Sequence, residues 1–144
     1  MIDAKDYVLA GDAIFTIRSH KTDTHFTYRV RKGRDHPMGN VFFVNVLTGP
    51  DNINNYTYMG MIDAQRPGID PYFLRTRNSK LSNDTLSFKA FVWFFQNLMR
   101  TGKTPEQCDF IPSTRCCRCG RPLTHPESAT DGIGPECKKR RLTR

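Results

Sequence analysis

The sequence predicts an α+β domain, in which a mostly antiparallel sheet of about five strands packs against one long helix and is followed by a small cysteine-rich segment. Two patterns predict the domain. Apolar and polar residues alternate over 13–18 and again over 26–31, which is the period of half-buried strands. Apolar residues recur at helical spacing over 88–99, so this segment has one continuous apolar stripe. The stripe needs an apolar partner, and the sheet is the one that the sequence offers.

The two alternating segments are joined by a short polar connection, so they predict a β-hairpin. Each segment places its apolar residues on one side and its polar residues on the other. The polar side is predicted to carry, together, Arg18, His25, Thr27, Arg29 and Arg31. A flat basic surface of this kind is suited to follow a phosphate backbone.

Three further strands are predicted downstream. Residues 41–47 are apolar and rich in β-branched and aromatic side chains, which predicts a central strand buried on both faces or nearly so. Residues 55–63 follow the turn-forming sequence of 49–52, and a shorter strand spans 72–76. In the strand over 55–63 we expect one side to hold Tyr56, Tyr58 and Ile62 and the other to hold Thr57, Met59 and Met61. The tyrosines fit either base stacking or, more commonly, a role at the edge of the core.

The long helix is predicted to begin after Ser82 or Asp84, either of which is a suitable cap, and to end at Gly102. Its core-facing stripe comprises Phe88, Phe91, Val92, Phe95, Leu98 and Met99. Trp93 and Phe94 lie off this stripe. We therefore expect the helix to be covered on a second side, either by the cysteine-rich segment or by another chain.

Four of the five cysteines lie between residues 115 and 138. Cys116 and Cys119 have the spacing that lets two thiolates face one tetrahedral metal ion. Cys137 follows Pro135 by two residues, which suits the first turn of a short helix, where the helix dipole favours a thiolate. This pattern predicts a structural Zn²⁺ site, a zinc knuckle with Cys116, Cys119 and Cys137 as ligands.

The fourth ligand is left open by the sequence. His125 lies between the paired cysteines and Cys137, and its imidazole would complete a Cys3His site. Cys117 and Cys108 are the alternatives, although both also fit as small apolar side chains. Iron is the alternative metal, because it also binds thiolates. A disulfide framework fits poorly, because the number of cysteines is odd and no signal peptide is evident.

The run from Cys116 to Cys137 reads Cys-x-x-Cys-Gly-Arg-x-Leu-Thr-x-Pro-x-Ser and then Gly-x-Gly-Pro-x-Cys. It resembles a small zinc-finger-like module found in uncharacterised proteins of tailed bacteriophages and bacterial mobile elements. Residues 47–58 also resemble phage proteins of this kind. The resemblance implies a phage-type origin and a zinc module, and it implies no established activity.

The chain is predicted to comprise an α+β domain over 1–103, a linker over 104–114 and a zinc-binding module with a basic tail over 115–144. Two prolines, Pro105 and Pro112, predict a stiffened linker that docks the module at a fixed place. No apolar run is long enough to span a bilayer, and the first thirty residues lack the features of a secretory signal. We therefore expect a soluble, cytoplasmic protein.

The formal net charge is +8 and the pI is near 9.5, which indicates a polyanionic partner if the charge is concentrated. Basic residues do gather in the hairpin, around the helix and in the tail. The predicted nucleic-acid contacts are Arg18, Arg29, Arg31, Lys32, Arg34, Arg118, Arg121, Lys138, Lys139, Arg140 and Arg141. The competing interpretation is an ordinary solvated basic surface.

No phosphate-binding Walker loop, zinc-protease motif, serine elbow or paired carboxylate is present in the sequence, so we expect no enzymatic activity and no small-molecule substrate. A treble-clef nuclease with His125 as base is the best catalytic alternative. The favoured hypothesis is a phage-type accessory protein that binds DNA or RNA. The alternative is a phage-encoded inhibitor or adaptor that binds a host defence or transcription protein, a role that exposed Trp93 and Phe94 would favour.

Overall fold

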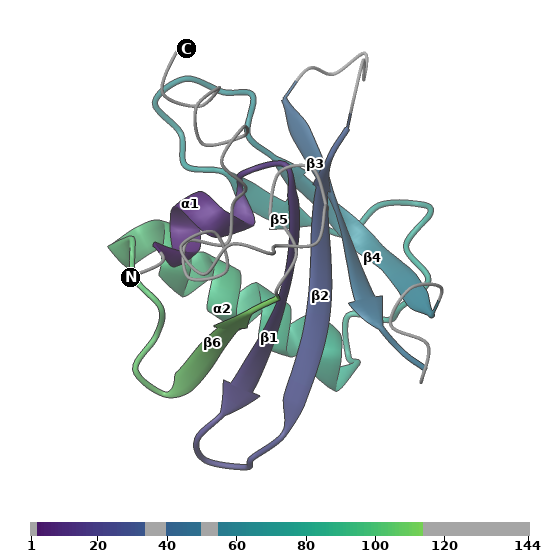
Figure 1. Cartoon of the computed structure of the whole chain (residues 1–144). Helices are drawn as coiled ribbons and strands as arrows, with labels where there is room; N and C mark the ends of the chain where they lie inside the picture. The colour runs from purple at the N-terminus through teal and green to yellow at the C-terminus, as the bar shows by residue number, and fades with distance from the viewer. Residues whose placement is uncertain (1–2, 34–39, 50–54, 114–144) are drawn as a thin grey trace.

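The computed structural model describes residues 3–33, 40–49 and 55–113. These residues form a curled six-stranded antiparallel sheet with one long and one short helix on the same side (Figure 1). The strand order is β5-β4-β3-β2-β1-β6. The elements are α1 (Ala4–Val8), β1 (Asp12–Ser19), β2 (His25–Lys32), β3 (Val41–Leu47), β4 (Tyr56–Asp63), β5 (Tyr72–Leu74), α2 (Leu86–Thr101) and β6 (Cys108–Pro112).

The five predicted strands are confirmed, and a sixth is added. β1 to β5 follow one another across the sheet, and the chain then returns through α2 so that β6 pairs with β1 at the opposite edge. β6 falls within the predicted linker of 104–114. It is short and ends at Pro112, which suits an edge strand because proline has no N–H to donate to a further neighbour.

Both helices have local signals at their ends. Asp3 caps α1 by accepting a 3.0 Å hydrogen bond from the backbone N–H of Asp6. The N-cap of α2 is Thr85, without a side-chain capping hydrogen bond, and is neither Ser82 nor Asp84 as predicted. The helix ends as expected at Gly102, whose φ of 73° is in the left-handed region. The backbone N–H of Gly102 donates to the carbonyl oxygen of Leu98 at 2.8 Å and so satisfies one of the last carbonyls.

The core is aromatic and lies between α2 and the sheet. Phe91 is fully buried, and its ring lies 5.1 Å from Tyr28 and 4.9 Å from Phe73 between centroids. Phe94, predicted to lie off the stripe on a second covered side of the helix, is also fully buried. Its ring stacks on Phe110 of β6 at 6.0 Å, so the unpredicted strand widens the apolar surface that α2 covers. Trp93, on the side that was expected to be covered, is 40% exposed among the described residues.

A β-bulge in β4 changes which side chains share a face. Tyr58 lies opposite Asn45 and Gly60 opposite Val44, so Met59 is an extra residue on β4. The bulge reverses the alternation beyond it. As a result Ile62 points into the core, on the opposite face from the tyrosines with which the sequence grouped it.

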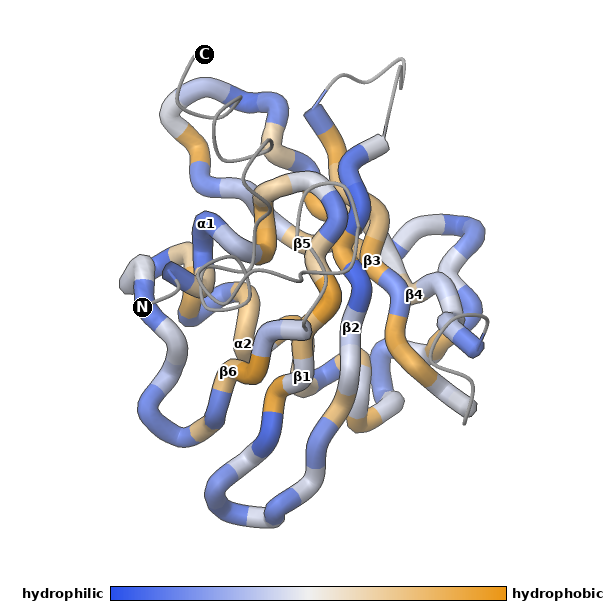
Figure 2. Tube along the Cα trace, in the orientation of Figure 1, coloured by the Kyte–Doolittle hydropathy of each residue, from blue (hydrophilic) through white to orange (hydrophobic). Residues whose placement is uncertain are grey.

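Figure 2 shows hydrophobic stretches along the strands and α2, whereas the tip of the β1–β2 hairpin is hydrophilic. β3 is central, as predicted. Its burial alternates, however, with Val44 and Val46 buried toward α2 and Asn45 and Leu47 half-buried on the other side. Among the residues that the structure describes, no helix is long and apolar enough to cross a membrane.

Candidate functional site

The polar side of the β1–β2 hairpin has the composition that the alternation predicts. Pairing in the antiparallel register places Arg18 opposite His25, Thr16 opposite Thr27, and Ile14 opposite Arg29. These side chains lie on the face away from α2, because their neighbours Phe15, Ile17, Tyr28 and Val30 are buried in the core. We call this surface, defined by Arg18, His25, Thr27, Arg29 and Arg31, the hairpin face.

Two arginines of the hairpin face are already paired with carboxylates. The Arg29 guanidinium donates two hydrogen bonds to Asp12, at 3.0 and 3.1 Å. The two side chains are only 24% and 14% exposed, so water screens this pair weakly. Arg18 donates two bonds, at 3.2 and 2.8 Å, to Oδ2 of Asp109 on β6. Each of these two positive charges is therefore offset by a neighbouring carboxylate.

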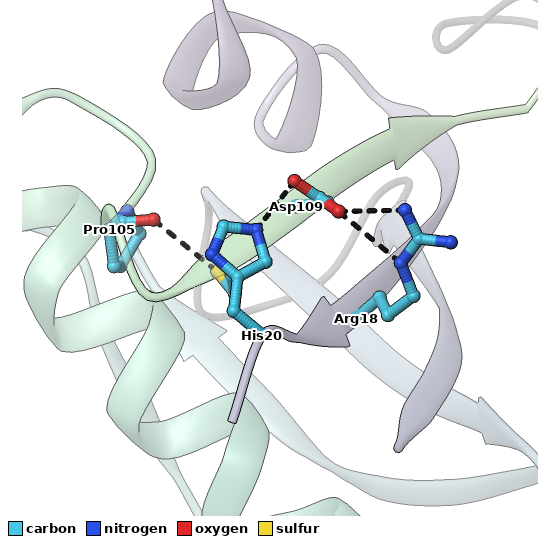
Figure 3. Close-up of polar contacts among 5 residues, drawn as sticks. Arg18, His20, Pro105 and Asp109 are labelled. Carbon is cyan, nitrogen blue, oxygen red and sulfur yellow. Dashed lines mark hydrogen bonds and ion pairs between the residues drawn. The ribbon is translucent and has the colours of Figure 1, made fainter. Parts of the chain in front are cut away.

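Asp109 joins Arg18 to His20. Nε2 of His20 lies 2.7 Å from Oδ1 of Asp109, and Figure 3 shows the carboxylate between the imidazole on one side and the guanidinium on the other. The hydrogen bonds with these two residues, first that of His20 and then those of Arg18, lower the pKa of the Asp109 carboxyl below its ordinary value. The same contact raises the pKa of Arg18. Asp109 therefore stays ionised well into the acidic range and keeps the cluster together.

Sequence reasoning did not find Asp109, because it lies in the predicted linker. It is 91 residues from Arg18 along the chain, and only the β1–β6 pairing brings them together. The isolated Phe110–Ile111 pair between Pro105 and Pro112 was the one sequence signal for a strand here. So short a run does not distinguish a strand from a loop.

Fewer basic side chains of the hairpin side are available to a phosphate backbone than the sequence suggested, because two of them are paired with carboxylates. Arg31 and Lys32 are exposed near the end of β2. Tyr58, the candidate for base stacking, donates or accepts a 3.0 Å hydrogen bond with Thr76, and its ring packs 6.2 Å from Phe43. These contacts favour the edge-of-core role for this tyrosine. Arg34 lies outside the described residues.

The predicted zinc site lies outside the part of the chain that the structure describes. This holds for the ligands Cys116, Cys119, Cys137 and His125, for the alternative ligand Cys117, and for the predicted contacts Arg118, Arg121, Lys138, Lys139, Arg140 and Arg141. Within residues 3–33, 40–49 and 55–113, no group of three or more His, Cys, Asp or Glu side chains is arranged to hold a metal ion.

Cys108 is the one candidate ligand that the structure describes. It is 6% exposed, belongs to the core, and its thiol donates a 3.6 Å hydrogen bond to the carbonyl oxygen of Pro105. Burial raises the pKa of the thiol to about 11. Its burial in the core and its hydrogen bond to Pro105 favour the small apolar role for Cys108 over a ligand role.

A family of unknown function, DUF6011, matches residues 111–142. The match starts in β6 and contains all four clustered cysteines and His125, whereas Cys108 lies outside it. It covers less than a quarter of the chain. No curated protein matches the chain, and no solved structure does.

Charge is distributed unevenly between the two parts of the chain. The described residues contain thirteen basic and nine acidic side chains, whereas residues 114–144 contain eight basic and three acidic ones. The 31 residues at the C-terminal end thus carry more than half of the formal charge of +8. Within this stretch the positive charge is concentrated in residues 138–144, which hold five basic and no acidic side chains, whereas residues 116–137 hold two basic and three acidic ones.

Proposed function

We propose that the protein binds nucleic acid, and that the basic residues of 114–144 supply most of the phosphate contacts. The observation that carries this proposal is the positive charge at the end of that segment, where residues 138–144 include Lys138, Lys139, Arg140 and Arg141 and no acidic residue. Binding to a nucleic-acid backbone depends chiefly on cations that are free to replace condensed counterions.

The contacts of the hairpin face support this assignment of roles. Arg18 and Arg29 are each neutralised by a carboxylate, so the face contributes fewer free cations than its sequence suggests. Arg31 and Lys32 remain exposed, and we propose that they extend the binding surface of the tail. The face would then orient the nucleic acid more than it would attract it.

The cysteine cluster is proposed to hold one structural Zn²⁺ ion. Three cysteines and a histidine form the donor set that zinc favours, with Cys116, Cys119 and Cys137 as ligands and His125 as the leading fourth. So short a segment has little apolar material for a core, and its apolar side chains of large size are Leu123, Ile133 and Leu142. Metal binding would supply folding free energy, on the order of 10 kcal/mol, in place of that core.

The biological setting proposed is a phage or mobile element, in which the protein acts as an accessory nucleic-acid-binding factor. The resemblance of residues 116–137 to modules of such elements supports this setting. The alternative, an adaptor or inhibitor that binds a host protein, is supported by one observation, the 40% exposure of Trp93. Phe94 does not support this alternative, because its ring is buried in the core.

The test is a salt titration with the full-length, zinc-loaded protein. Binding to labelled duplex DNA, single-stranded DNA and RNA is followed by fluorescence anisotropy at several salt concentrations. The variant K138Q/K139Q/R140Q/R141Q should weaken binding and, for duplex DNA, reduce the slope of log K against log salt by about three to four. Metal analysis should show one zinc per chain, lost in Cys116→Ser and Cys137→Ser.

The matched control removes four cations from the body of the protein, as R31Q/K32Q/R66Q/R77Q. It should lower affinity less and leave most of the salt slope in place. If the body variant abolishes binding and the tail variant does not, the sheet carries the function instead. If the wild type shows no salt-dependent binding to any of the three nucleic acids, the proposal is wrong.

A further inference from the structure

Helix α2 has a second row of apolar residues that the core does not use. Leu86, Ala90 and Trp93 follow one another at i, i+4 and i+7, so they lie along one side of the helix. The core row, with Phe88, Phe91 and Phe95, lies on the other side. Leu86 is 69% exposed and Trp93 is 40% exposed. Packing against the sheet uses only one apolar side of a helix, so the second apolar side of α2 is left available for another contact.

This second row forms one wall of a groove of about 480 Å³. The facing wall comes from the end of the β1–β2 hairpin, where Ile17 and Phe26 line the groove, and the start of β6 adds Cys108. Ile17 and Cys108 are almost completely buried and form an apolar floor. A 2.9 Å hydrogen bond from the backbone N–H of His20 to the carbonyl oxygen of Gln107 holds the hairpin against the β6 side.

The polar lining of the groove has one sign of charge. Its charged side chains are Lys21, from the hairpin connection, and Lys89, from α2, and no acidic residue lines it. The uncharged polar residues of the lining are Ser19, Thr22, Thr24 and Gln107. The groove therefore combines an apolar surface with two cations on opposite walls, which is complementary to an apolar group flanked by carboxylates.

We propose that this groove binds a short segment of a partner protein that presents one or more large apolar side chains beside acidic residues. A tryptophan at the centre of an apolar surface is a frequent anchor of protein–protein contacts. The exposed fractions of Leu86 and Trp93 show that the apolar wall is open, whereas sites for small molecules enclose most of their ligand. A protein segment is the occupant that such an open surface fits.

Charge disfavours the nearest competing occupants. The chain's own segment 114–144 carries eight basic and three acidic residues, so Lys21 and Lys89 would repel it. A second copy of this chain would bring a formal charge of +8. An acidic segment of another protein gains from the same two lysines. This site is separate from the proposed nucleic-acid-binding tail, and the one proposal does not depend on the other.

The first step of the test is a selection with the full-length, zinc-loaded protein. A display library of random peptides of about 12 residues is depleted on the variant Leu86→Asp and then selected on the wild type. Leu86 is the first residue of α2, where an acidic side chain is favoured by the helix dipole, so the variant should fold. The enriched peptides should contain large apolar residues and an excess of Asp and Glu.

The second step uses Trp93, the sole tryptophan of the chain, as a reporter inside the groove. A synthetic copy of an enriched peptide should shift its emission to shorter wavelength and saturate it. The variant K21E/K89E should weaken binding by at least about tenfold. The matched control K80E/K103E makes the same charge change at exposed lysines that do not line the groove, and it should stay within about twofold of the wild type.

Several results would overturn the proposal. One is a selection in which no peptide is enriched on the wild type after depletion on Leu86→Asp. Another is enrichment of peptides that contain no excess of Asp and Glu. Another is an equal loss of binding in the two lysine variants, which would indicate general charge attraction. A saturable shift of Trp93 emission by dodecanoate, with none from any enriched peptide, would assign the groove to a small amphipathic carboxylate instead.

Discussion

The two faces of the sheet are built from the same strands, yet they are held together by different interactions. Toward α2, β1 and β2 present Phe15, Tyr28 and Val30, which are fully buried among rings from the helix. Away from α2, alternate positions of the same strands present Arg29 and Thr27, which bond to side chains on β1. Over β1 and β2, one face is a packed aromatic core, and the other is a layer of ion pairs and hydroxyl contacts.

The difference shows why a strand face predicted to be basic from the sequence can carry little unpaired positive charge in the folded protein. Alternation determines which residues share a side of a strand. Whether a cation there is free depends on the carboxylates that neighbouring strands bring, here Asp12 from β1 and Asp109 from β6. We therefore expect the helix-side face to govern stability, and the opposite face to contribute through small, charge-dependent effects.

The largest effect is expected for Phe91→Ala. Phe91 is fully buried and contacts the rings of Tyr28, Phe73 and Phe95, so its loss leaves a large cavity. The free energy of unfolding should fall by about 3–5 kcal/mol, measured by urea denaturation. Thr27→Ala on the opposite face should cost less than about 1 kcal/mol. Equal losses from the two variants would contradict the division between the faces.

A smaller loss is expected for Tyr28→Phe, which keeps the ring and removes one polar group. The Tyr28 hydroxyl donates a 2.7 Å hydrogen bond to the buried carbonyl oxygen of Ser87, and burial raises its pKa well above the ordinary value. Removal should cost about 1–2 kcal/mol of unfolding free energy. Tyr58→Phe is the control, because its hydroxyl bond to Thr76 is only partly buried. Its loss should be smaller, and a larger one would refute this ranking.

On the opposite face, the coupling between Arg29 and Asp12 should be measurable but modest. A double-mutant cycle with Arg29→Gln and Asp12→Asn should give a coupling free energy of about 0.5–1 kcal/mol, because both side chains are mostly shielded from water. The same cycle for Arg18 and Asp109, which are 48% and 39% exposed, should give a smaller value. Addition of salt should reduce the second coupling more than the first, and the reverse order would contradict the assignment.

The smallest effect is a pH dependence centred on Asp109. Its pKa in the folded protein is lowered by His20 and Arg18, so the unfolded state takes up the proton first as pH falls. The stability that the carboxylate contributes is present above its unfolded pKa, near 4, and is lost as pH falls through the lower folded value. Asp109→Asn should therefore be less stable than the wild type at neutral pH, with the difference shrinking below about pH 4. The same change at the exposed Asp70 is the control for the loss of a surface carboxylate.

Much of the fold follows from local patterns. Residues 13–18 and 26–31 form the predicted hairpin, because the alternation places Ala13, Phe15 and Ile17 on the same buried face as Tyr28 and Val30. The long helix follows from its stripe and from Gly102 at its end. The bulge at Met59 was not predicted from the sequence. Both faces of β4 are partly apolar, so one extra residue does not visibly disturb the apolar–polar pattern of this strand. Phe94 was missed because its partner Phe110 belongs to an unpredicted strand.

The candidate sites also differ in how far local sequence predicts them. The spacing of Cys116, Cys119 and Cys137 predicts a zinc site from a short stretch of sequence, and the basic tail predicts phosphate contacts from composition; both stay predictions, because these residues lie outside the described part of the chain. The groove beside Trp93 was anticipated only as a second covered side of the helix. Its floor and its charge come from the hairpin, α2 and β6 together.

The sequence by itself determined the alternation of β1 and β2, the apolar stripe of α2 and the concentration of positive charge after residue 114, because each depends on residues close together in the chain. Tertiary structure alone decided that β6 pairs with β1 and that Asp109 neutralises Arg18. It also decided that Lys21 and Lys89 face one groove. These features join residues tens of positions apart, and their geometry depends on strand pairing that no local pattern specifies.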